Sequence, residues 1–192
     1  MTGSYPGFRW REAGSGDAEL LSRLFVAGWR QTYAGLMPDG VLACLESNPN
    51  HDPASWRRRL GRRPPDRWTR VVETEAGEPV GFVWFGREEG RLPGYAGEVE
   101  KIYLLKPVQG RGLGRALMQD TFRTLEAVRL APVVIWVFEV NRPAFGFYET
   151  LGGRALGERA LVFEAEGREF WETAYGWPRS GLPAHTRSPA RR

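Results

Sequence analysis

A glycine-rich turn, Gln109-Gly110-Arg111-Gly112-Leu113-Gly114, restricts the fold of this chain more than any other segment. Alternating apolar residues over Glu98–Leu105 predict a strand before it, and the apolar spacing from Leu113 to Val128 predicts a helix after it. Glycines in such a turn let backbone N–H groups point toward one position at the positive end of the helix, which suits a pyrophosphate. Close packing of the turn is the alternative interpretation.

The spacing of these glycines excludes two familiar phosphate-binding motifs. A dinucleotide fold requires G-x-G-x-x-G after an early first strand, and a nucleotide P-loop requires Gly-Lys-Ser/Thr. Neither pattern is present. The turn therefore needs a fold of another kind around it.

The remaining patterns predict an α+β fold. One strand at the start is followed by a helical third, then by a hairpin, and the glycine turn lies inside a strand-helix-strand-helix core that a second hairpin closes. The expected strands are Phe8–Arg11, Arg70–Thr74, Val80–Phe85, Glu98–Leu105, Val133–Val140, Val162–Ala165 and Glu169–Trp177. The expected helices begin after Asp17, near Pro38, near Trp56, at Leu113 and after Asn141, whose side chain would cap the last one.

Composition narrows the class of protein. With 192 residues, 42% of them hydrophobic, the chain suits one globular domain, which we place at residues 1–177. One cysteine, Cys44, and two histidines cannot form an internal disulfide or a zinc site of the usual kind, so we expect no metal. No apolar run reaches the roughly 18 residues of a membrane helix, and residues 1–16 lack a signal-peptide core, so we expect a cytoplasmic protein without a membrane partner.

The positive charge lies mainly at the end of the chain. Residues 178–192 hold four arginines, three prolines and no acidic residue, which predicts a basic, disordered tail. The rest of the chain has 23 basic and 23 acidic residues, so its formal charge is zero. A net charge of +4 is therefore a weak indication of nucleic-acid binding.

Within residues 1–177 the charge is polarised. Seven arginines stand between Arg57 and Arg70, whereas Val71–Glu100 holds seven glutamates and two arginines. Arginines interleaved with Trp56 and Trp68 could suit single-stranded nucleic acid. The four-residue spacing of Trp56 and Leu60 instead favours a short helix with a buried stripe and a solvated basic face. Nucleic acid is thus the less favoured partner.

Two motifs carry a resemblance to a known family. Gln109–Gly114 matches a Q/R-x-x-G-x-G/A loop, and Asn141–Gly152 is similar to an N-x-x-A-x-x-F-Y-E-x-x-G helix. In this order and separation they resemble the GNAT superfamily of acyl-CoA N-acyltransferases, over about residues 8–177. Gly153, where an aromatic residue is common, departs from the pattern.

The resemblance implies a mixed, mostly antiparallel, splayed sheet of six to seven strands flanked by helices, with acetyl-CoA between the fourth and fifth strands. Backbone amides from Gly110 to Gly114 would hold the pyrophosphate, and the main chain of the preceding strand would pair with the pantetheine. Arginine near the loop would suit the phosphates. The implied cofactor-binding residues are Ile102, Tyr103, Leu104, Gln109, Gly110, Arg111, Gly112, Leu113, Gly114, Arg115 and Asn141.

Acyl transfer to an amine needs a base and an acid. Tyr148, with an ordinary pKa near 10, is the candidate acid that protonates the leaving thiolate. Glu98 and Glu100 are candidate bases, two apart on one strand face, where each carboxylate raises the pKa of the other. We favour Glu100, which is nearer along the strand to Leu104. The alternative for Tyr148 is a structural role in the core, and the alternative for the two glutamates is a solvated position on an exposed strand face.

The acceptor is the least readable part of the sequence. Trp29 and Tyr33 would shape its pocket, or belong to the core, and Asn141 would contact acetyl-CoA or only cap its helix. The leading hypothesis is an N-acetyltransferase. It would transfer the acetyl group of acetyl-CoA to a primary amine of a small molecule or peptide, by direct attack in a ternary complex. The excess of glutamate in Val71–Glu100 fits a cationic amine. A catalytically silent CoA-binding module is the alternative, and a homodimer is left open.

Overall fold

The computed structural model describes residues 2–62 and 64–178 of the chain. The sequence prediction of a disordered tail at residues 178–192 therefore lies outside the described residues, apart from Pro178.

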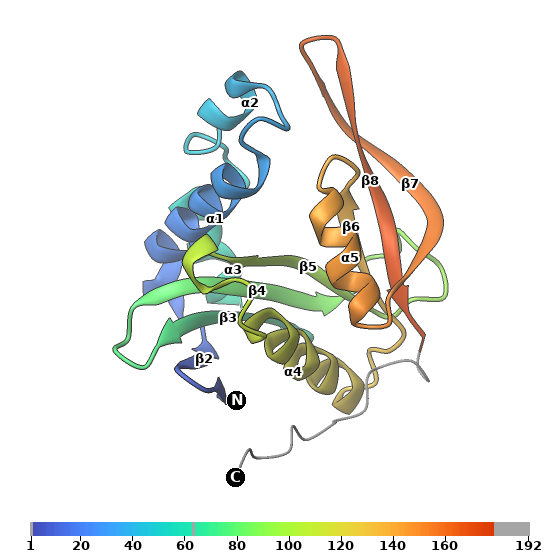
Figure 1. Ribbon diagram of the computed structural model, residues 1–192. Helices are drawn as coiled ribbons and strands as arrows, with labels where there is room; N and C mark the ends of the chain where they lie inside the picture. The colour runs from blue at the N-terminus through green and yellow to red at the C-terminus, as the bar shows by residue number, and fades with distance from the viewer. Residues whose placement is uncertain (1, 63, 179–192) are drawn as a thin grey trace.

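An eight-stranded sheet forms the centre of the molecule, in the order β1-β2-β3-β4-β5-β6-β8-β7 (Figure 1). Only β5 and β6 run parallel, so the sheet is mixed and mostly antiparallel, as predicted. The strands are β1 (Gly3–Tyr5), β2 (Phe8–Glu12), β3 (Arg67–Thr74), β4 (Pro79–Arg87), β5 (Gly97–Leu104), β6 (Val133–Phe138), β7 (Arg154–Ala165) and β8 (Arg168–Trp177).

The predicted count of six to seven strands is too low by the strand β1. β1 pairs with β2, with Gly3 opposite Trp10 and Tyr5 opposite Phe8. A strand of three residues is too short to show an alternation of apolar and polar side chains in the sequence. β7 also starts at Arg154 rather than Val162. As an edge strand it leaves most of its side chains exposed, so it lacks the apolar alternation of a half-buried strand.

Helices cover both faces of the sheet. Figure 1 shows α1 to α3 on one face of β2–β5, α4 on the other, and α5 beside β6. The α helices are α1 (Ala18–Tyr33), α2 (Asp39–Ala43), α3 (Pro53–Arg62), α4 (Leu113–Ala127) and α5 (Arg142–Thr150), and short 3-10 turns lie at η1 (Ser15–Asp17) and η2 (Lys106–Val108). One apolar core forms under α4 and α5, and a second under α1 and α3. Val128, expected on the buried stripe of α4, lies past its end and is 44% exposed.

The basic run splits between a helix and a strand. Trp56 and Leu60 are buried under α3, as predicted, while Arg57 and Arg58 on the same helix are exposed. Arg70 does not belong to that solvated face. It is buried on β3, where its guanidinium pairs with Asp120 and donates to Thr124 Oγ1 at 2.8 Å. Arg70, one of the seven arginines of the basic run, thus connects β3 with α4 inside the core.

The parallel pair β5 and β6 separates soon after it forms. Only Gly97 and Glu98 pair with β6, at Val133 and Val134, although β5 continues to Leu104 and β6 to Phe138. The splay predicted from the resemblance is therefore present. It leaves one edge of β5 facing a gap that starts beyond Glu98, and this gap holds the site described below.

None of the helices in the described residues is long and apolar enough to cross a membrane. Within 2–62 and 64–178, His, Cys, Asp and Glu side chains form no group of three or more that could hold a metal ion.

Candidate active site

The glycine turn forms the start of α4. Gly110 and Gly112 have φ angles of 72° and 82°, in the left-handed region that favours glycine. Backbone hydrogen bonding of α4 begins with Ala116 N–H donating to Gly112 O at 3.1 Å, so the N–H groups of the preceding residues lie at the open, positive end of the helix. This geometry suits a phosphate group.

Neighbouring elements hold the turn in place. Tyr5 Oη donates to Arg111 O at 2.9 Å. A Cβ on Gly112 would lie 2.6 Å from Tyr5 Oη. Gln109 Nε2 donates to Leu104 O at 2.7 Å, which joins the turn to the end of β5. At Gly114 a Cβ would lie 3.3 Å from the Phe147 ring, so this glycine lets α4 and α5 pack closely.

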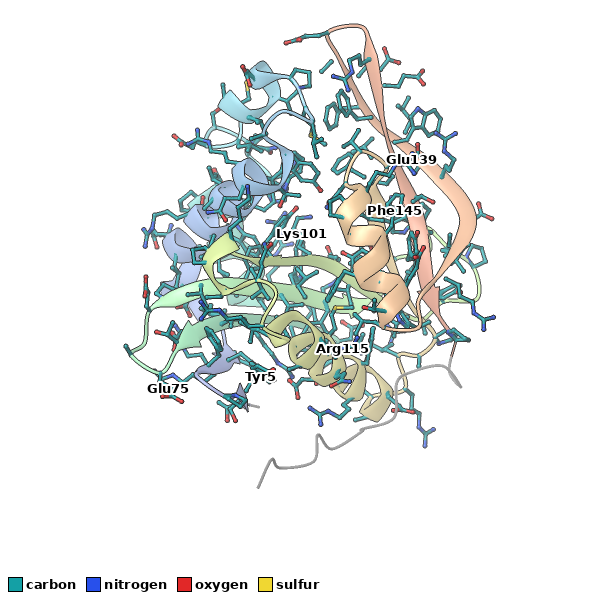
Figure 2. All side chains as sticks on the ribbon, viewed as in Figure 1. Tyr5, Glu75, Lys101, Arg115, Glu139 and Phe145 are labelled. Carbon is teal, nitrogen blue, oxygen red and sulfur yellow. The ribbon has the colours of Figure 1, made fainter. Side chains whose placement is uncertain are left out.

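The two arginines of this region have different surroundings. Arg111 is exposed beside the turn. Arg115 donates from its guanidinium to Thr150 O at 3.2 Å, which connects α4 with the end of α5. Figure 2 shows Arg115 on α4, with Tyr5 near the start of that helix. Arg111 is therefore the arginine with more freedom to meet a phosphate.

A small cavity of about 80 Å³ lies where β5 and β6 separate. It brings together seven residues that the sequence analysis singled out, from α1, β5 and α5. They are Trp29, Tyr33, Glu100, Ile102, Tyr103, Asn141 and Tyr148. Its other lining residues are Lys101, Ile135, Trp136, Val137, Phe138 and Glu172. We call this space the inner cavity.

The phenols of the inner cavity are protonated. Tyr148 is 6% exposed, and burial raises its pKa well above the ordinary value. Burial also raises the pKa of Tyr33 to about 12, although side-chain hydrogen bonds with Asn141 and Tyr103 oppose this shift. Tyr148 can therefore donate a proton at any physiological pH.

Asn141 occupies the N-cap position of α5, but the expected capping bond is not made. Within the described residues, its side chain forms no hydrogen bond to the first turn of that helix. It is hydrogen-bonded to Tyr33 of α1 instead. Asn141 thus stands at the N-cap position as predicted, but its side chain joins two walls of the inner cavity instead of capping the helix.

An irregularity in the β4–β5 ladder lies at Glu100. Val99 pairs with Phe85 and Lys101 with Trp84, so Glu100 is an extra residue between two pairs. The Glu100 carboxylate forms an ion pair with Arg67 of β3, a residue that lies opposite Gly86 of β4. Glu100 lines the inner cavity, whereas Glu98 lines neither of the two cavities described here.

Burial is the main influence on both carboxylates. It raises the pKa of Glu98 to about 7, with a smaller contribution from the charge of Glu100 and an opposing one from Arg91, whose Nη1 is 3.8 Å away. It also raises the pKa of Glu100, against the attraction of Arg67. The mutual effect expected from their spacing is thus secondary to desolvation.

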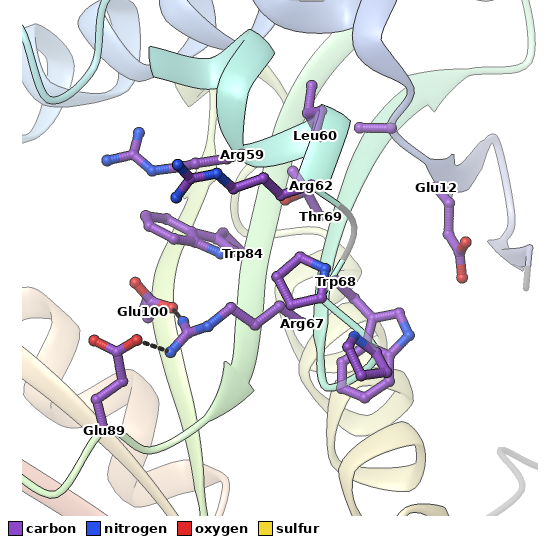
Figure 3. A pocket seen from close by; sticks show the side chains of 13 residues that line it. Glu12, Arg59, Leu60, Arg62, Arg67, Trp68, Thr69, Trp84, Glu89 and Glu100 are labelled. Atoms are coloured by element: carbon purple, nitrogen blue, oxygen red, sulfur yellow. Dashed lines mark hydrogen bonds and ion pairs between the residues drawn. The ribbon is translucent and has the colours of Figure 1, made fainter.

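A larger cavity of about 550 Å³ adjoins Glu100 on the side of α3 (Figure 3). We call it the outer cavity. Glu100 lines both cavities, so they share one wall. The outer cavity is lined by Glu12, Ala13, Arg59, Leu60, Arg62, Pro64, Pro65, Arg67, Trp68, Thr69, Trp84, Glu89 and Glu100.

Several residues of the site were not singled out from the sequence. Lys101 stands in the gap between α1 and α5 (Figure 2), with its Nζ 5.2 Å from the centre of the Trp84 ring, and burial lowers its pKa. Glu172 reaches the inner cavity from β8 and pairs with Arg91 at 3.3 Å. The sequence did hold one signal for Glu172, because it lies two residues from both Phe170 and Ala174 and so shares a strand face with these buried residues.

Two indole groups of the inner cavity also stand out. In the described part of the chain, the buried Nε1 atoms of Trp29 and Trp136 have no hydrogen-bond partner. Buried donors are normally paired, so each is a free donor toward a water or a substrate. The sequence left open whether Trp29 and Tyr33 belong to the core or to a pocket. Their rings contact Phe138 in the core and also line the inner cavity, so both positions apply.

Comparisons with known proteins point to one family. Residues 29–152 match the model of the Acetyltransferase (GNAT) family. The uncharacterised N-acetyltransferase YuaI of Bacillus subtilis strain 168 is 31% identical over 168 residues, covering 88% of this chain and 91% of that protein.

Solved structures share the fold at lower identity. The ribosomal-protein-S5-alanine acetyltransferase of Vibrio fischeri superposes with a TM-score of 0.70 at 18% identity, covering 96% of this chain and 100% of that one. The spermidine N-acetyltransferase of Vibrio cholerae, in complex with CoA and spermine, has a TM-score of 0.66 at 16% identity, covering 92% and 98%.

Proposed function

Since the chain belongs to the acetyltransferase (GNAT) family and is an acyl-CoA-dependent N-acetyltransferase, we propose that it acetylates a primary amine of a small molecule or peptide by direct attack in a ternary complex. The observation that carries the proposal is the separation of β5 from β6. It creates a cavity with a buried, protonated phenol, Tyr148, and a carboxylate, Glu100, in its walls.

The residues around the splay fit acetyl-CoA. The N–H groups from Gly110 to Gly114 would bind its pyrophosphate, with Arg111 beside them. The edge of β5 that β6 leaves beyond Glu98 would pair with the pantetheine in the way of an added strand. When bound, acetyl-CoA supplies an acetyl group already activated as a thioester.

Two side chains manage the protons of the transfer. Glu100 accepts a proton from the incoming ammonium or amine, directly or through a water, so that the nitrogen lone pair can form the new N–C bond. As the C–S bond breaks, Tyr148 Oη donates its proton to the departing sulfur, and the extra proton left on the acylated nitrogen returns to the Tyr148 oxygen, directly or through a water. Glu98, which lines neither cavity and has a raised pKa, is a second candidate base that would need a bridging water.

Direct attack also agrees with the position of the cysteine. A covalent acyl-enzyme would need a nucleophile in the site, and Cys44 is the one cysteine of the chain. It is exposed at the end of α2 and lines neither cavity. The position of Cys44 therefore supports direct attack over an acyl-enzyme on this cysteine.

The test is release of the CoA thiol from acetyl-CoA in the presence of a varied panel of amines, with the product identified by mass. Initial rates at several concentrations of both substrates should give intersecting lines, which indicate a ternary complex. Parallel lines would contradict direct attack. Binding of acetyl-CoA without thiol release for any amine would favour the silent CoA-binding module.

A further inference from the structure

The outer cavity has the dimensions of a binding site for a small molecule. Its volume of about 550 Å³ falls within the roughly 300–1,000 Å³ of typical ligand pockets, whereas the inner cavity has about 80 Å³. Because Glu100 separates the two spaces, an amine beside this carboxylate could have the rest of its molecule in the outer cavity. What lines the outer cavity then decides which amines fit.

The charges of the outer cavity are separated onto two walls. Its lining holds three arginines and three glutamates, so net charge does not select a cation. On one wall Arg67 pairs with both Glu89 and Glu100. Figure 3 shows Arg59 and Arg62 together on the other side of the Trp84 ring, away from these carboxylates.

Arg59 is held in place by aromatic rings. Its guanidinium carbon lies 4.8 Å from the centre of the Trp84 ring and 5.3 Å from that of Trp56. Its Nη1 donates to the backbone carbonyl of Asn50. Stacking fixes the plane of the guanidinium, which presents its remaining N–H groups in a constant direction.

In residues 2–62 and 64–178, no carboxylate forms an ion pair with the guanidinium of Arg59 or Arg62. The charges of Glu100 and Asp52 act on Arg59 from a distance and only partly offset the effect of burial. Burial disfavours the charge of Arg59, because it lowers the pKa of the guanidinium. An anion from outside would relieve that cost, and guanidinium groups match carboxylates and phosphates in geometry.

The glutamates that suggested a cationic acceptor are largely engaged elsewhere. Glu73 pairs with Arg9 and Arg11 of β2, and the Glu88 carboxylate accepts three loop N–H groups. Glu75 lies exposed near the turn between β3 and β4. The negative charge of Val71–Glu100 is thus only partly directed at the site.

We infer, on the basis of the proposed function, that the acceptor is an amine that also carries an anionic group. Arg59 and Arg62 bind the anionic group in the outer cavity, Trp84 packs against the body of the molecule, and the amine reaches Glu100. Amino carboxylates, including amino acids and peptides with a near C-terminus, and aminoalkyl phosphonates have this chemistry. A polyamine lacks it and would place a cation beside two arginines.

The experiment compares pairs of amines that differ only in the anionic group. An α-amino acid is paired with its amide, an ω-amino acid with the corresponding alkylamine, and an aminoalkyl phosphonate with the same alkylamine. We expect kcat/KM to favour the anionic members by roughly 10- to 100-fold, the usual range for charge-assisted hydrogen bonds. The phosphonate arm distinguishes a site for phosphate-like groups from one for carboxylates.

Variants assign the preference to the arginines. Arg59→Gln and Arg62→Gln should raise KM for the anionic amines and leave the neutral amines nearly unchanged. Arg58→Gln is the matched control, since Arg58 is an exposed residue of α3 that lies outside the outer cavity. Arg62 is itself exposed, so its variant tests the idea even if the Arg59 variant does not fold.

Binding separates this inference from the proposed function. Calorimetry with the CoA complex measures the affinity for each pair without any reaction. Anion-selective binding that Arg62→Gln abolishes supports the inference even if no amine is acetylated, an outcome that would contradict the proposed function alone. Equal affinity for paired amines, or a preference that survives both variants, would overturn the inference while acetylation by itself would leave the proposed function intact.

Discussion

The glycine turn and the outer cavity lie on opposite faces of the same sheet and present different kinds of groups. The turn presents backbone N–H groups from one continuous segment, Gln109 to Gly114, at the end of a helix. The outer cavity presents side chains from α3, β3, β4, β5 and the loop after β4. A site made of main chain is encoded in local spacing, whereas a site made of side chains depends on which segments the fold brings together.

The two regions differ in their titration as well. The groups of the turn are backbone amides, whose charge does not vary with pH. On β5, where Glu100 borders the outer cavity, burial shifts the pKa of Glu98, Glu100 and Lys101. We therefore expect acetyl-CoA binding to vary little with pH and amine acetylation to vary strongly. The variants below test this division, from the largest expected effect to the smallest.

Tyr148→Phe should have the largest effect on turnover. The substitution removes only the phenolic hydroxyl, so kcat should fall by roughly 10²- to 10⁴-fold, the range for general acid catalysis. Acetyl-CoA affinity, measured by calorimetry, should stay within a few-fold. Tyr175→Phe is the control, because that residue lies near Tyr148 but lines neither cavity. A kcat near that of the unaltered protein would exclude Tyr148 as the acid.

Gly112→Asp should weaken acetyl-CoA binding by roughly 100-fold or more. The side chain would collide with Tyr5 Oη at a φ of 82°, and its charge would repel a pyrophosphate. Gly157→Asp provides the control, since Gly157 has a φ of 81° and open space around it on β7. If the folded Gly112 variant is still stabilised against heat by acetyl-CoA, the pyrophosphate binds elsewhere.

Glu100→Gln should lower kcat/KM by roughly 10- to 100-fold at neutral pH. An alkylamine with a pKa near 10 is mostly protonated there, so loss of the base matters most at low pH, and the defect should shrink as the pH rises to about 9. Rate profiles for Glu100→Gln and Glu98→Gln across this range assign the base. A defect of constant size at every pH would argue that Glu100 has a structural role through Arg67.

Glu98→Gln should stabilise the fold at high pH. The pKa of Glu98 is about 7 when folded, above its ordinary value of 4.5, so the folded state holds the proton more tightly and stability is lost as pH rises between these values. The neutral variant avoids this loss. The free energy of unfolding of the variant at pH 8 should exceed that of the unaltered protein by up to about 3 kcal/mol. Loss of the ion pair between Glu98 and Arg91 would reduce this gain.

Urea denaturation at pH 8 and pH 4.5 measures this difference, which should disappear at the lower pH. Glu75→Gln, a change at an exposed residue, is the control and should have little effect at either pH. A gain of equal size at both pH values would show that packing, rather than ionisation, explains it.

Removal of the residues after Pro178 should have the smallest effect. We propose that residues 1–177 form the catalytic unit, because residues 178–192 contain only one aliphatic side chain larger than alanine, Leu182, and so offer little apolar surface to bury. The melting temperature and kcat should both change little, as measured by calorimetry and thiol release. A loss of more than a few-fold in kcat would show that the tail contributes to the site.

The parts of the site that the sequence predicted share a local signature. The turn from Gln109 to Gly114 and the helix that carries Tyr148 are short, continuous patterns. Residues that escaped prediction act at a distance: Tyr5 holds the turn from a strand more than a hundred residues earlier, and Arg67 meets Glu100 across two strands. Their partners become visible only when the sheet order is known.

By itself, the sequence determined the order of most strands and helices and singled out the glycine turn and Tyr148 as candidates for phosphate binding and for the acid, since periodicity, glycine spacing and a short motif act within a few residues. Only the tertiary structure decided how Glu98 and Glu100 differ. An extra residue in the β4–β5 ladder places Glu100 between both cavities beside Arg67, and burial gives Glu98 its high pKa. Strand register and desolvation depend on the whole packed sheet, and no local pattern contains them.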